Sequence, residues 1–172
     1  MKKSTFKFLL FFVFILCSIC ITAQDAPPSD DIFRLRNVAT GKFLTDAEAS
    51  ATPVTLTHSG EPQNTQWTFV ESGAFYNIDS EVNGILRASG SPFLVLSTGT
   101  TTSSSDKIWA IQHNQTDDTY RFQSGNSGRF MYHDPNGTVT HVAVSATDDR
   151  SIWELIPFVE TPAETAPDED TG

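Results

Sequence analysis

The feature of this sequence that most constrains its fold is a unit that occurs three times, with copies that begin at Phe33, Tyr76 and Tyr120. Each copy opens on an aromatic residue, carries a glycine at a constant distance from it and closes on a tryptophan at an almost constant distance. The chain has only three tryptophans, and each stands at the same point of a copy. Repetition at such a period predicts a pseudo-threefold fold. The three sets are Phe33, Gly41 and Trp67; Tyr76, Gly84 and Trp109; and Tyr120, Gly128 and Trp153.

Inside each copy, apolar and polar residues alternate with period two. Phe33 and Leu35 alternate with Arg34 and Arg36, and the segments that contain the tryptophans alternate in the same way. This pattern is typical of a β-strand with one buried and one solvated face. Glycine-containing turn sequences recur between these segments, and no stretch after the N-terminal region keeps a helical period. The sequence therefore predicts an all-β domain.

Each copy predicts four strands, and twelve strands in three equal units predict a β-trefoil. The first and fourth strands of each copy would form a six-stranded barrel, and the second and third would form three hairpins that cap one end. The repeated aromatic residues are interpreted as core rather than as a sugar-stacking platform. The repeated glycine is expected to take a positive φ at a tight connection. The predicted strands span residues 32–37, 42–46, 53–58, 66–70, 75–79, 85–88, 93–97, 107–112, 120–124, 129–133, 139–145 and 151–156.

The two ends of the chain are expected to lie outside this domain. Residues 1–24 contain three lysines, then an apolar run over residues 8–21, and then small residues before a polar segment. This order predicts a secretory signal peptide. An uncleaved N-terminal anchor, or a lipid anchor on Cys20, remains an alternative. Residues 25–31 predict a mobile lead, 32–158 the β-trefoil, and 159–172 an acidic disordered tail. Both cysteines, Cys17 and Cys20, precede the domain, so no disulfide is expected and a bacterial secreted (extracellular or periplasmic) protein is predicted.

The charge balance excludes two classes of partner. The chain has 11 basic and 21 acidic residues and a net charge of −10, and three of the basic residues lie in the predicted signal peptide. Such an acidic domain would repel nucleic acid and anionic membrane surfaces unless a local basic patch overcame the repulsion, and the sequence shows no such patch. We therefore predict no nucleic-acid partner and no membrane partner after signal cleavage.

Two segments carry a resemblance to a known family. Residues 37–44 (NVATGKFL) and 124–131 (SGNSGRFM), which are followed downstream by Trp67 and Trp153 respectively, resemble the ricin B-type β-trefoil lectins. The resemblance covers residues 32–158 and implies a secreted, non-catalytic carbohydrate-binding domain. The family's closing Gln-x-Trp motif is altered, because Thr65, Lys107 and Ser151 stand where its glutamine would be. The aspartate that sugar-binding members carry shortly after the glycine is also replaced, by Thr45, Ala88 and Tyr132, although Asp46 and Asp134 follow closely.

Shallow pockets on the hairpin cap are the predicted sugar sites. Recognition of a sugar in water needs carboxylate or amide groups for paired hydroxyls and an aromatic face for the ring. The third copy gathers both kinds of group, the first copy supplies polar groups only, and the second copy looks degenerate. The predicted carbohydrate-binding residues are Tyr132, His133, Asp134, Asn136 and His141 in the third copy, and Asp46, His58, Asn64 and Gln66, with Glu48, in the first.

No catalytic or metal-binding pattern emerges from the sequence. The four histidines lack the spacing of a zinc site, and adjacent acids such as Asp117 and Asp118 fall in predicted turns, where they cannot flank a substrate. We predict no enzyme activity, no cofactor and a monomer that binds a glycan or polysaccharide. Two alternatives stay open. One is a protein-interaction or inhibitor-like trefoil that binds through loops 59–65 and 98–106, and the other is a former binding domain kept as a structural unit.

Overall fold

The computed structural model describes residues 27, 31–46, 54–57, 62–88, 93–98 and 103–159. Twelve strands lie in these residues, four in each sequence unit, together with two short 3-10 helices. The first unit contains β1 (Phe33–Asn37), β2 (Phe43–Thr45), β3 (Thr55–Thr57), the helix Pro62–Thr65 and β4 (Trp67–Ser72). The second contains β5 (Phe75–Ser80), β6 (Gly84–Ala88), β7 (Leu94–Ser97) and β8 (Trp109–Asn114). The third contains β9 (Thr119–Ser124), β10 (Phe130–His133), β11 (Val139–Val142), the helix Asp149–Ser151 and β12 (Trp153–Pro157).

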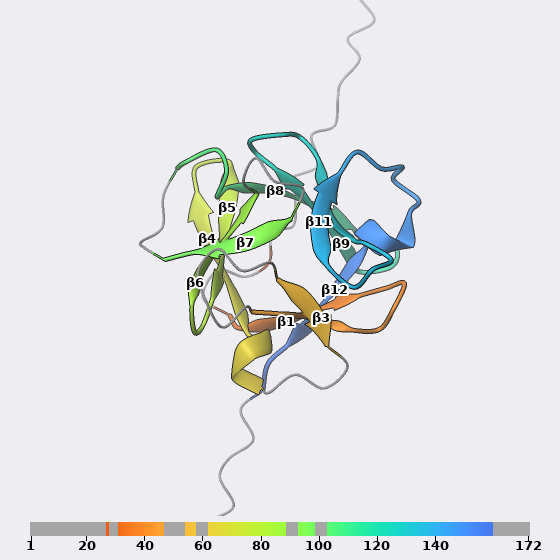
Figure 1. The fold of residues 1–172 in the computed structure, drawn as a ribbon, viewed down its shortest axis with the longest axis horizontal. Coiled ribbons are helices and arrows are strands. Elements are labelled where there is room, and N and C mark those ends of the chain that lie inside the picture. The colour runs from red at the N-terminus through yellow and green to blue at the C-terminus, as the bar shows by residue number, and fades with distance from the viewer. Residues whose placement is uncertain are drawn as a thin grey trace, which may run out of the picture.

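The strand pairing forms a closed barrel with three hairpins attached. β1 pairs with β12 and β4, β4 with β5, β5 with β8, β8 with β9, and β9 with β12, which closes a ring of six strands. The hairpins are β2–β3, β6–β7 and β10–β11. Figure 1 shows the resulting three lobes around one axis. This is a β-trefoil, and the predicted fold class is confirmed.

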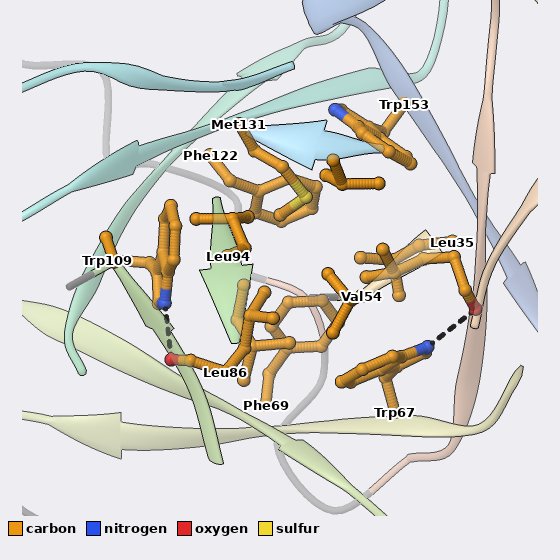
Figure 2. Packing of buried hydrophobic residues seen from close by; sticks show 14 of the residues in the cluster. Leu35, Val54, Trp67, Phe69, Leu86, Leu94, Trp109, Phe122, Met131 and Trp153 are labelled. Carbon is orange, nitrogen blue, oxygen red and sulfur yellow. Dashed lines mark hydrogen bonds between the residues drawn. The ribbon is translucent and has the colours of Figure 1, made fainter. Parts of the chain in front are cut away.

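The core of the barrel is built from the repeated residues. β1 alternates buried and partly exposed side chains along its whole length, as its sequence pattern requires. The three tryptophans are fully buried and surround an apolar cluster that includes Phe69 and Phe122, whose rings stack at 5.8 Å (Figure 2). Phe33 is buried, while Tyr76 and Tyr120 are partly buried against the same cluster.

The three indole N–H groups have different environments. Trp67 Nε1 donates to the carbonyl of Leu44 at 3.2 Å, and Trp109 Nε1 donates to that of Leu86 at 3.1 Å (Figure 2). Trp153 Nε1 is equally buried but has no hydrogen-bond partner in the described part of the chain. The pseudo-threefold core is therefore symmetric in its packing and asymmetric in its hydrogen bonds.

The second unit is one residue shorter than the other two at the turn after its first strand. Gly41 (φ +67°) and Gly128 (φ +65°) lie in turns that end before the following strand begins, whereas Gly84 (φ +116°) is already the first residue of β6. As a consequence, Leu86 pairs with Leu96 as Leu44 pairs with Leu56. Ala88 is thus equivalent to Asp46 and not to Thr45, which corrects the alignment obtained by counting from each glycine.

Several predictions fall outside the described residues. These are the signal peptide, most of the lead and tail, Glu48, His58, and much of loops 59–65 and 98–106, and they stay predictions. Within the residues that the structure does describe, no helix is long and apolar enough to cross a membrane.

Candidate functional site

The β10–β11 hairpin carries the five residues predicted to form the third-copy sugar site. Met131 pairs with His141 and His133 pairs with Val139, so both histidines share the inward face with the core residues. His133 is 6% exposed and His141 is 4% exposed. Tyr132 lies between Met131 and His133 and so points to the opposite, partly exposed face. The hairpin therefore separates Tyr132 from the two histidines.

The two histidine side chains are buried on the core-facing side of the hairpin. His141 occupies the position that Leu56 and Leu96 fill in the other units, and its Nδ1 lies 3.0 Å from the hydroxyl of Ser127. Both ring nitrogens of His133 are buried without a partner among the described residues. Burial lowers the pKa of His133, the nearby charges of Lys42 and Arg150 lower it further, and Asp134 opposes them. Burial and these two cations therefore disfavour the protonated form of His133.

Asp134 and Asn136 form the turn of the same hairpin. The Asp134 carboxylate accepts from the backbone N–H of Asn136 at 3.0 Å. The Asn136 side-chain oxygen accepts from the backbone N–H and the hydroxyl of Thr138, at 3.1 and 2.8 Å. These polar side chains shape the turn itself. Tyr132 thus lies on the other face of the hairpin from the two histidines, and sugar binding by any of the five predicted residues remains a prediction.

Three of the first-copy residues do come together, at the junction with the second unit. The backbone N–H of Asp46 donates to the carbonyl of Asn64 at 2.7 Å, and the carbonyl of Gln66 accepts from the backbone of Glu81 at 3.2 Å. Asp46 is 4% exposed, and Gln66 is buried as well. His58 lies outside the described residues, so its place in this cluster is untested.

The Asp46 carboxylate links the β5–β6 turn to the first hairpin through hydrogen bonds. It accepts hydrogen bonds from the hydroxyl of Ser80 and, at 3.1 Å, from the amide of Asn83. Burial raises the pKa of Asp46, and these hydrogen bonds act in the opposite direction. Because the group is enclosed and bonded to the neighbouring unit, its geometry is that of a structural clamp.

In two copies, the hydroxyl residue at the position of the missing Gln-x-Trp glutamine accepts a hydrogen bond from an arginine that also contacts a phenylalanine ring. Arg34 Nε donates to the Thr65 hydroxyl at 3.1 Å, and the guanidinium carbon lies 3.8 Å from the ring centroid of Phe43. In the third copy, Arg121 Nε donates to the Ser151 hydroxyl at 3.3 Å, with its guanidinium carbon 3.7 Å from the Phe130 ring centroid. The second copy has Asn77, whose amide donates to the carbonyl of Lys107 at 2.9 Å.

A pocket of about 260 Å³ lies beside Arg121, on the outer wall of the barrel. Its β-sheet side is the β8–β9 hairpin, where Gln112 pairs with Arg121 and Asn114 pairs with Thr119. Ala146 and Ile152, from the connection between β11 and β12, form an apolar side. His113 also borders the pocket, its ring stacked on Tyr120 with centroids 4.4 Å apart and its Nε2 2.9 Å from Asp118 Oδ1.

Sequence reasoning did not single out this pocket, although a signal for it exists. The outward residues Gln112, Asn114 and Thr119 beside Arg121 are polar, whereas the equivalent positions beside Arg34 are Ile156, Phe158 and Ile32. Those beside Asn77 are Val70, Ser72 and Phe75. A comparison of these outward positions would have shown that the surroundings of Arg121 differ.

Comparison with known proteins identifies the family of the domain. A family model described as the endo-acting ulvan lyase beta-trefoil domain matches residues 33–153. The chain is similar to an endo-acting ulvan lyase of Formosa agariphila, with 52% identity over 136 residues, which covers 75% of this chain and 26% of that protein. It is also similar to ulvan lyase NLR42 of Nonlabens ulvanivorans, with 38% identity over 135 residues, which covers 74% of this chain and 24% of that protein. The chain thus spans about a quarter of the length of these curated relatives.

Solved structures agree on the fold. The BEL β-trefoil matches with a TM-score of 0.66 and 19% identity, covering 78% of this chain and 97% of that one. At this level of identity the similarity supports the β-trefoil fold alone. The β-trefoil part of the sequence-based resemblance is confirmed, whereas membership of the ricin B-type family in particular is not.

Proposed function

Because the chain belongs to the β-trefoil domain family of endo-acting ulvan lyases, we propose that it is a carbohydrate-binding module for ulvan and has no lyase activity of its own. The observation that carries this proposal is the 52% identity to an ulvan lyase over a stretch that makes up only 26% of that enzyme. In that relative the matched stretch makes up about a quarter of the enzyme, so most of the enzyme lies outside it. The most direct contribution of the β-trefoil to such an enzyme is to hold the polymer near the catalytic part.

The side chains of the domain support a binding role over a catalytic one. The repeated aromatic residues build the core. Of the titratable groups on the hairpins, Asp46, His133 and His141 are enclosed rather than presented to a substrate. A general base must reach the proton that it removes, which an enclosed group cannot do. Among the described residues, no group of three or more His, Cys, Asp or Glu could hold a metal ion.

The predicted signal peptide fits this proposal. A polysaccharide is too large to enter the cell intact, so a module that binds it acts outside the cytoplasm. We therefore propose a secreted protein whose partner is a glycan polymer.

Affinity electrophoresis in gels with and without ulvan tests the proposal. We expect ulvan to retard the protein, and a gel containing a neutral glucan serves as the control for non-specific retention. Incubation with ulvan should release no reducing ends and no absorbance from unsaturated products. A protein that migrates equally in all gels would contradict ulvan binding, and product release would contradict the non-catalytic role.

A further inference from the structure

We propose that the pocket between the β8–β9 hairpin and the β11–β12 connection is a subsite for an anionic substituent, carboxylate or sulfate ester, on a sugar ring, with Arg121 as its cation. This inference deepens the proposed function and rests on it for the polymeric ligand. It places a recognition site on the barrel wall, away from the hairpin cap where the sequence predicts one.

The charge of Arg121 is fixed in place by neutral partners. Nε donates to the Ser151 hydroxyl, one Nη donates to the carbonyl of Ser145 at 3.1 Å, and the guanidinium carbon lies 3.7 Å from the Phe130 ring centroid. The arginine ion pairs of the described residues are Arg36 with Glu154 and Arg87 with Asp106, and Arg121 takes part in neither. A guanidinium held in this way loses little rotational freedom when it binds an anion.

The charges around the pocket are mixed, which sets the expected strength of binding. Burial lowers the pKa of Arg121 and the charge of Asp148 raises it, so the group stays a cation at any physiological pH. Asp118, which is 83% exposed, is bonded to His113, and His113 lines the pocket. These two carboxylates compete with an anionic ligand. We therefore expect weak binding that falls with added salt.

The three copies of the fold provide a comparison within one molecule. Arg34 is held as Arg121 is, by a hydroxyl and a phenylalanine ring, but the outward strand residues beside it are apolar. Only beside Arg121 do the corresponding strand positions carry a glutamine, an asparagine and a threonine, the first two from β8 and the third from β9. The framework of the arginine is thus shared, and the polar wall is specific to Arg121.

The chemistry of the wall fits a charged monosaccharide unit. A guanidinium fork binds a carboxylate or sulfate through paired N–H donors. Gln112 Nε2 donates to Gln123 at 3.4 Å, which leaves its second N–H and its carbonyl oxygen for ring hydroxyls, while Ala146 and Ile152 offer an apolar face. Asn114 is bonded to Asp117 and to the Thr116 backbone N–H, and it contributes its second N–H. The volume of about 260 Å³ lies just below the range of roughly 300–1,000 Å³ that holds drug-sized ligands. The pocket therefore suits one sugar ring of a longer chain.

NMR titration tests the subsite with three small probes: methyl glucuronide, glucose 6-sulfate and methyl glucoside. We expect the Nε–H signal of Arg121 and the amide signals of β8 and β9 to shift with at least one anionic probe and not with the neutral one. The probe that acts identifies carboxylate or sulfate as the source of the charge. Shifts with neither anion, or equal shifts with the neutral glucoside, would overturn the proposal.

Matched variants separate the subsite from general effects. Arg121→Gln should weaken binding of the active probe by about tenfold or more, as expected for a charged hydrogen bond, while Arg34→Gln should leave it unchanged. Asp148→Asn, which keeps an oxygen for the Arg150 N–H, should strengthen binding by about twofold through loss of the competing charge. Asp148→Asn still tests the subsite if Arg121→Gln fails to fold. Equal effects of Arg34→Gln and Arg121→Gln would contradict the subsite.

The two proposals can fail separately. If ulvan retards the protein but no anionic probe shifts Arg121, the subsite is wrong and the binding module stands. If the probes shift Arg121 but ulvan does not bind, the polymer is a different anionic glycan and the proposed function is wrong.

Discussion

The unequal hydrogen bonding of the three buried tryptophans predicts unequal costs of the same substitution. Trp109→Phe and Trp153→Phe each remove part of a fully buried ring in equivalent core positions. The loss of packing is therefore similar in the two variants, on the order of 1–3 kcal/mol. The difference between them comes from the indole N–H.

Trp109→Phe also removes a buried hydrogen bond to the carbonyl of Leu86. That bond contributes about 1 kcal/mol to the free energy of unfolding. Trp153→Phe instead removes a buried donor that has no partner in the described residues, which relieves a desolvation penalty of at least about 1 kcal/mol. We therefore expect Trp109→Phe to be the more destabilising substitution by about 2 kcal/mol.

Urea unfolding followed by far-ultraviolet circular dichroism measures the difference without relying on tryptophan fluorescence. The slope of the free energy against urea should be the same in all variants, so that midpoints can be compared. Trp67→Phe is the control, because Trp67 donates to Leu44 and should behave as Trp109 does. Equal losses at Trp109 and Trp153, or a larger loss at Trp153, would refute the reasoning.

Two further predictions concern stability. His133 has a lowered pKa in the folded protein, so as the pH falls below about 6.5 the unfolded chain takes up the proton first. The free energy of unfolding then drops by up to about 1.4 kcal/mol per pH unit. His133→Leu should remove this part of the drop between pH 7.5 and 5, and an unchanged dependence of the free energy of unfolding on pH, measured by urea unfolding, would contradict it. Gly84→Ala should destabilise the protein more than Gly41→Ala in the same assay. A Cβ on Gly84 would lie 2.6 Å from the Ser97 carbonyl oxygen, while one on Gly41 meets nothing within 4 Å. We expect the free energy of unfolding to fall by about 1 kcal/mol for Gly41→Ala, from the positive φ alone, and by about 2 kcal/mol or more for Gly84→Ala.

The fold could be predicted from the sequence because the same information occurs three times. Period-two alternation gives the strands, and the repeated aromatic residues mark the inward face. The one-residue shortening before β6 was not visible in the sequence. Gly84 keeps the same sequence separation from Tyr76 as the equivalent glycines do from their aromatic residues, but it lies in β6 and not in the turn before it. Register depends on strand pairing, which spacing alone does not report.

The candidate sites were harder to predict for a different reason. Polar residues on a predicted cap were expected to face solvent, yet His141 stands where the other copies have leucine. The pocket near Arg121 combines β8 and β9 with the connection between β11 and β12, which comes later in the chain, after the whole β10–β11 hairpin. Its walls meet only once the barrel has closed, so no local pattern of the sequence could define it.

The paired arginines allow stability and binding to be separated within one molecule. Arg34 and Arg121 each combine one hydroxyl hydrogen bond with a cation–π contact, which together contribute about 1–2 kcal/mol. Replacing either by glutamine should therefore lower the free energy of unfolding by a similar amount, with Arg121 slightly costlier through its bond to Ser145. Only the change at Arg121 should weaken retardation by ulvan, because only there do Gln112 and Asn114 complete a polar wall. Loss of ulvan binding in proportion to lost stability, in both variants, would mean that the arginines act on binding through the fold and not through contact with the polymer.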